Sequence, residues 1–216
     1  TVDGLPPAPR SEADAAEDPG RDYTAGEALR TRAFWLLGIG HGMALLVVSA
    51  VNVHAISHMK ESMGYTLAEA SLVITMLTVA QALGMLIGAA VGDRWEKRVV
   101  AAGCMLAHAS GLLLLTFASN AAMLLAFALL HGGAWGLRGP FMQALRADYF
   151  GLRAIGMILG LSAAIIAVGQ VAGPLIAFAT QEFTNEWRYF WGGAAVDEIL
   201  LSMFTSAVTA NRWNNK

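Results

Sequence analysis

Four long stretches of the sequence contain no Asp, Glu, Lys or Arg, and they constrain the fold more than any other feature. They cover residues 34–59, 70–92, 99–137 and 154–181. A helix needs about 20 apolar residues to cross the roughly 30 Å hydrocarbon core of a bilayer. Three stretches suit one crossing each, and residues 99–137 are long enough for two. Because the runs are continuous rather than alternating, they predict membrane helices and not barrel strands.

The predicted fold is an all-α integral membrane bundle of six helices, in which five spans are clear and the sixth is doubtful. Ser119 and Asn120 form the polar pair that is placed to turn between the third and fourth helices. The sixth range has a suitable length but contains Asp197 and Glu198. Within a bundle covering residues 29–216, the expected spans are 34–57, 70–92, 99–117, 121–144, 154–179 and 189–210.

The charged residues exclude several classes of protein. Charged side chains make up 14% of the chain, against about 25% in soluble domains. The charges are few and unevenly spread along the chain and provide no basic field, so nucleic acid is not an expected partner. The single cysteine, Cys104, excludes an internal disulfide framework and a Cys-based metal site. No paired metal-ligand spacing and no glycine-rich phosphate loop after a strand occur in the sequence, so neither a metal nor a cofactor is expected.

The basic residues predict the orientation of the bundle. If the first helix runs from inside to outside, only Lys60 and Arg188 among the 14 basic residues fall in outer loops. This bias predicts an even number of spans and two cytoplasmic termini in a plasma (inner) membrane. Residues 1–28 contain four prolines, seven acids and no apolar run. They predict a disordered cytoplasmic leader rather than a signal peptide.

Many of the 23 glycines recur at intervals of four within the expected helices. Residues four apart share one helix face, and glycine there lets two backbones approach closely. Tight packing is the simpler interpretation, and sliding or rocking of helices over these contacts is a second one. Proline within a span removes a backbone hydrogen bond and predicts a kink. The residues with these packing or kink roles include Gly84, Gly88, Gly92, Gly169, Gly173 and Pro174.

The loop after the second expected helix carries a motif. Residues 88–98 read GAAVGDRWEKR, which resembles the Gly-x-x-x-Asp-Arg-x-Gly-Arg-Arg/Lys motif of the major facilitator superfamily. Ala89 and Glu96 stand where the family has glycine, and nearby glycines compensate in part. The resemblance implies a gate latch, whereas the charges alone suit a positive-inside anchor. The loop residues concerned are Gly88, Gly92, Asp93, Arg94, Lys97 and Arg98.

This resemblance implies a particular architecture and activity. The chain is similar to the C-terminal six-helix half of a twelve-helix transporter, with residues 1–28 as the linker between halves. It implies alternating-access transport of a small solute in a lipid bilayer, an N-terminal half as partner, and no enzymatic activity. Residues 27–35, EALRTRAFW, are similar to the oxalate/formate and monocarboxylate-like branches.

Polar side chains inside the expected spans are candidates for the solute cavity, because a polar group facing lipid costs several kcal/mol. In the family layout, the first, second, fourth and fifth helices of a half line the cavity, which implies a packing role for His108. Arg138 suits either a bidentate anion site or an interfacial position. His41 suits either a proton carrier or a packing role. The implied cavity candidates are Arg138, His41, Gln81, Asn52, His131 and Gln170.

Two other classes stay open on sequence alone. One is a membrane scaffold or receptor without transport, which would not require Arg138, His41 and Gln81 to converge on one polar cavity. The other is an intramembrane serine protease with Ser162 as nucleophile. The five histidines all precede Ser162, whereas that enzyme class places its histidine on a later helix, which argues against an enzyme.

Overall fold

The computed structural model describes residues 22–91 and 94–210, with the side chains at positions 91, 98 and 203–210 left outside the description. The described residues form helices joined by short connections and contain no strand, as the sequence predicts. The helices are α2 (Ala25–Leu29), α3 (Arg32–Met63), α4 (Leu67–Val91), α5 (Lys97–Thr116), α6 (Ala121–Phe150), α7 (Ile155–Thr184) and α8 (Arg188–Ala210).

Five helices among the described residues, α3 to α7, are long and apolar enough to cross a membrane. Their presence confirms the predicted class of an all-α membrane bundle. The residues of the sixth expected span form α8, which is not among those five helices. Asp197 and Glu198 lie within it, so its crossing of the membrane stays a prediction.

Local capping explains where several helices begin and end. The Asn120 side chain accepts a 3.0 Å hydrogen bond from the Met123 backbone and starts α6 at the predicted turn. Thr31 caps α3 in the same way. At the other end of α3, Gly64 adopts φ 74°, a left-handed conformation that glycine accepts without steric cost.

The end of the predicted leader differs from the expectation of disorder. Residues 1–21 lie outside the description, but residues 25–28 belong to α2, which the Thr24–Glu27 capping box begins. The Tyr23 backbone N–H donates a 2.9 Å hydrogen bond to the Phe150 carbonyl, and Ala28 is buried. These contacts hold the short helix against the turn between α6 and α7, which the polar composition of the leader does not indicate.

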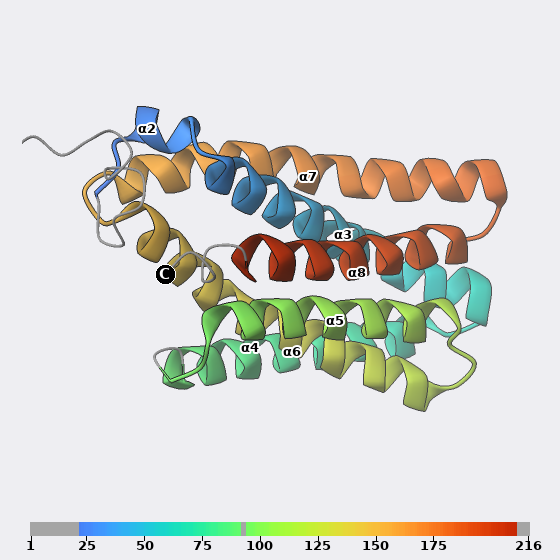
Figure 1. The fold of residues 1–216 in the computed structure, drawn as a ribbon. Coiled ribbons are helices and arrows are strands. Elements are labelled where there is room, and N and C mark those ends of the chain that lie inside the picture. The colour runs from blue at the N-terminus through green and yellow to red at the C-terminus, as the bar shows by residue number, and fades with distance from the viewer. Residues whose placement is uncertain (1–21, 92–93, 211–216) are drawn as a thin grey trace, which may run out of the picture.

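The helices form two groups (Figure 1). Helix α3 packs along α7, while α4 and α5 both pack along α6, and α8 packs along α5. Contacts between the α3/α7 pair and the other four helices are sparser. In the view of Figure 1, α7 lies along the top with the first turns of α3 just below it, α8 lies in the middle, and α5 and α4 lie below α8. The bundle is therefore an α3/α7 pair set against an α4/α5/α6/α8 group.

Glycines provide the closest contacts within each group. A side-chain Cβ at Gly136 of α6 would collide with the Gln81 backbone carbonyl of α4. A Cβ at Gly169 or Gly173 of α7 would likewise collide with carbonyls of α3. The glycine spacing in the sequence therefore corresponds to backbone contacts between helices. Helix α7 continues through Pro174, whose carbonyl oxygen lies 3.0 Å from His54 Nε2.

Candidate solute-binding site

Helix α6 directs two arginines into the protein. Arg138, Met142 and Arg146 are spaced by four residues and therefore lie along one helix face. Arg138 is 3% exposed and Arg146 is 1% exposed. Burial of two guanidinium groups on a membrane helix is costly unless each finds hydrogen-bond acceptors or an opposite charge. The surroundings of these two side chains therefore define the candidate site.

Arg146 connects α6 to α3 through His41. Its Nη2 donates to His41 Nδ1 at 3.0 Å, and its Nη1 donates to the Met142 carbonyl at 3.3 Å. A longer Nη2 contact reaches the Leu37 carbonyl at 3.5 Å. A guanidinium can only donate, so His41 Nδ1 must accept, which assigns the ring proton of a neutral His41 to Nε2. His41 is itself 9% exposed.

Arg138 lies nearer to α8. Its Nε and Nη1 atoms are buried without hydrogen-bond partners, and so are both carboxylate oxygens of Glu198. Glu198 is 0% exposed. The charges of Arg138 and Glu198 act on each other. Among the described residues, however, no hydrogen bond or ion pair joins the two side chains. The two opposite charges therefore neutralise each other only at a distance.

A histidine pair occupies the interface between α5 and α6. His108 Nδ1 and His131 Nδ1 are 3.0 Å apart, so one ring donates and the other accepts. Both histidines are 1% exposed. His108 was expected to pack and His131 to line the cavity, and the structure places the two in direct contact. A role for His131 in solute binding stays a prediction.

The remaining cavity candidates lie apart from the buried arginines. Gln81 is half-buried on α4, and its backbone carbonyl packs against Gly136. Asn52 on α3 and Gln170 on α7 are exposed on the described bundle. His41 contacts Arg146 directly, and the Arg138 charge acts on the His41 ring. The same charge acts on His108, the hydrogen-bond partner of His131. Of the six candidates, Arg138, His41 and His131 are therefore the buried ones.

The basic residues of the sequence place Arg146 in an inner segment after the fourth expected span, and the side of the membrane on which it lies stays a prediction. Helix α6 runs to Phe150, six residues beyond the expected end at 144, and buries Arg146. The available signal was the interval of eight residues between Arg138 and Arg146, which places both on one face of a helix. The length of the helix was the missing information.

The loop motif is described only in part. Gly92, Asp93 and the Arg98 side chain lie outside the description, and Arg94 is exposed. Gly88 packs close to the Leu137 carbonyl. Lys97 Nζ forms a 2.6 Å ion pair with Asp148 Oδ2, which ties the start of α5 to the last turn of α6. A latch role for this loop stays a prediction.

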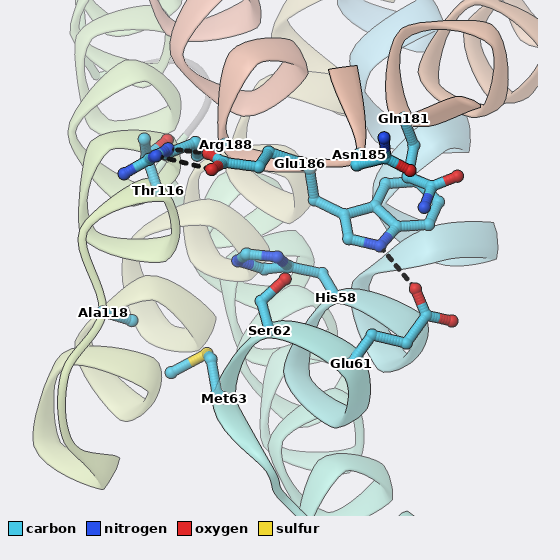
Figure 2. A pocket seen from close by; sticks show the side chains of 11 residues that line it. His58, Glu61, Ser62, Met63, Thr116, Ala118, Gln181, Asn185, Glu186 and Arg188 are labelled. Atoms are coloured by element: carbon cyan, nitrogen blue, oxygen red, sulfur yellow. Dashed lines mark hydrogen bonds and ion pairs between the residues drawn. The ribbon is translucent and has the colours of Figure 1, made fainter. Parts of the chain in front are cut away.

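A separate pocket opens at the C-terminal end of α3 (Figure 2). It has a volume of about 430 Å³ and is lined by the ends of α3, α5 and α7 and the start of α8. Trp187 Nε1 donates a 2.8 Å hydrogen bond to Glu61 Oε2 at its edge. His58 lines it, 17 residues after His41 and thus about 25 Å further along α3. The pocket is distinct from the arginine cluster.

Long apolar helices that bury arginines in their shared interior define a polytopic integral membrane protein. Residues 35–209 match the profile of the Major Facilitator Superfamily. The chain therefore belongs to this superfamily of membrane transporters, which confirms the resemblance. The comparison with curated proteins gave no significant match. Membership of the oxalate/formate or monocarboxylate-like branch stays a prediction.

Proposed function

We propose that this chain is the C-terminal six-helix half of a secondary active transporter, and that the transporter moves a small organic anion by alternating access. The observation that supports the anion is the pair of buried arginines on α6. Three of their donor nitrogens, Arg138 Nε and Nη1 and Arg146 Nε, are buried without partners. Superfamily members are generally transporters and not enzymes, so we propose no enzymatic activity.

The charge balance of the cluster favours an anionic solute. Arg138 and Arg146 carry two positive charges, and Glu198 is the acid whose charge acts on Arg138. A carboxylate brings one negative charge and accepts two parallel hydrogen bonds from a guanidinium. Binding such a group would satisfy donors that are otherwise unsatisfied and would reduce the excess of positive charge. A neutral solute could do only the first of these.

The packing supports movement between two states. Backbone-to-backbone contacts at glycines join α4 to α6 and α3 to α7, while contacts between the two groups are sparser. Smooth contacts of this kind allow packed helices to shift against each other. In the proposal, an N-terminal half completes the cavity, the loop between α4 and α5 is cytoplasmic, and the two halves rock around the bound anion in a plasma (inner) membrane.

The proposal predicts that Arg146→Gln strongly impairs transport. In proteoliposomes with the intact transporter, uptake of radiolabelled oxalate, formate and lactate would be compared at neutral pH. Loss of a charge-assisted bidentate contact costs about 2–5 kcal/mol, so uptake efficiency for the transported anion should fall at least about tenfold.

The matched control is Arg153→Gln, which removes the same charge from an exposed position outside the loop motif and should retain uptake. Both variants must elute as monodisperse protein with wild-type thermal stability. Equal uptake by the wild type and a folded Arg146→Gln variant would contradict the assignment of Arg146 to the anion site.

A further inference from the structure

The His41–Arg146 hydrogen bond joins the two helix groups. His41 belongs to α3, which packs on α7, whereas Arg146 belongs to α6, which packs on α4 and α5. The bond is 3.0 Å long and both partners are at least nine-tenths buried. A buried hydrogen bond is sensitive to any change in the charge of its donor or acceptor, because the surrounding dielectric constant is low.

The direction of this hydrogen bond makes it sensitive to one proton. Arg146 can only donate, so the bond requires a lone pair on His41 Nδ1. A proton that binds Nδ1 turns the acceptor into a donor and places an imidazolium against a guanidinium. The bond is then lost, and repulsion between the two cations replaces it.

The other groups around His41 increase this sensitivity. The charges that act on it are those of Arg138 and Arg146, both on α6. On α7, the residue packed against Gly38 and Gly42 is the apolar Ile165. The described part of α4 has one ionisable residue, Glu69 in its first turn. On α8, the charge of Glu198 acts on Arg138, and neither acid is among the charges that act on His41. Protonated His41 would therefore face two cations, and an added anion would stabilise it.

Loss of the bond also frees the part of Arg146 that suits a carboxylate. Nε and Nη2 lie on one edge of the guanidinium, and Nε is already without a partner. When His41 no longer accepts from Nη2, this edge presents two parallel donors, the geometry that binds both oxygens of a carboxylate.

We propose that His41 and Arg146 form a coupled site for one proton and one carboxylate. The proton binds the lone pair of His41 Nδ1, and the carboxylate binds the Nε/Nη2 edge of Arg146. Each ligand strengthens the binding of the other by the same factor, as linkage requires. This inference rests on the proposed function and adds that the anion is transported together with a proton, with the His41–Arg146 bond closed in the empty state.

Proton uptake on anion binding tests this site directly. Intact transporter in detergent, weakly buffered at pH 7, would receive oxalate, formate or lactate in the presence of a pH indicator. We expect uptake of about one proton per bound anion, and an affinity that rises by up to tenfold for each unit by which the pH falls. His41→Gln keeps a hydrogen-bond acceptor but cannot titrate, so it should bind the anion without proton uptake and with little pH dependence.

The matched control is His58→Gln, which alters a buried histidine that bonds to the Leu115 carbonyl rather than to an arginine and should take up protons as the wild type does. Histidine ¹⁵N NMR gives a readout independent of transport, with His41 carrying its proton on Nε2 before the anion is added and on both nitrogens afterwards. Anion binding with a neutral His41, or with unchanged proton uptake in His41→Gln, would overturn the coupled site and leave the proposed function standing. No binding of any of the three anions between pH 5.5 and 8 would contradict both.

Discussion

Gly136→Ala is expected to lower the free energy of unfolding of the chain by about 2–3 kcal/mol, the upper part of the range that is typical of overpacking. The new methyl group would collide with the Gln81 carbonyl oxygen of α4, and the backbone nitrogen of Met85 is also too close. Neither backbone can move without shifting its helix. The loss should exceed the gain of about 1 kcal/mol that alanine brings in helix propensity.

Reversible unfolding in mixed micelles with increasing SDS would measure this change. Gly139→Ala is the matched control, because no atom lies within 4 Å of the Cβ position at Gly139 on the same helix. That variant should be unchanged or slightly more stable. If the two variants had equal stability, the close contact between α4 and α6 would be refuted.

Arg138→Met is expected to destabilise the chain by up to about 3 kcal/mol at neutral pH, the lower limit for removing one member of a contacting buried ion pair, because Arg138 and Glu198 act on each other without direct contact. Glu198 would then keep a fully buried carboxylate without the positive charge that acts on it. The loss should shrink as the pH falls, because a proton on Glu198 removes the unbalanced charge. The same unfolding assay measures both effects.

A double-mutant cycle separates this electrostatic effect from lost packing. Glu198→Leu introduced together with Arg138→Met replaces both charges with apolar side chains and should recover most of the stability. If the stability losses of the two single variants add up to the loss of the double variant within about 0.5 kcal/mol, the two residues do not interact. The coupling would then have to be assigned to other groups around Arg138.

The sequence was sufficient for the fold because membrane helices depend on local composition. The charge-free stretches located α3 to α7, and the Asn120 cap confirms the predicted turn before α6. Helix ends were less predictable, since polar residues continue a helix where it leaves the hydrocarbon. The Thr24–Glu27 capping box that begins α2 is visible in the sequence, but the contacts that hold α2 against Phe150 depend on tertiary structure.

The site was less predictable than the fold. The charge of Arg138 inside the expected span 121–144 marked it as unusual, and the structure buries it. The partner of His41 could not be found from the sequence, because Arg146 lies 105 positions away and appeared to belong to a basic inner segment. Asn52 and Gln170 are polar residues of the same kind, yet both are exposed on the described bundle. Polarity identifies candidates, but helix rotation decides which of them meet.

As one half of an anion transporter, this chain should transport nothing without its partner half. The most direct test reconstitutes two proteins separately, the 216-residue chain and the complete product of the reading frame that encodes it, and measures uptake of radiolabelled oxalate, formate and lactate. We expect saturable uptake of at least one of these anions by the complete product and none above empty liposomes by the chain alone. Robust, saturable uptake by the chain alone would contradict the half-transporter claim, and absence of uptake by a folded complete product would contradict anion transport.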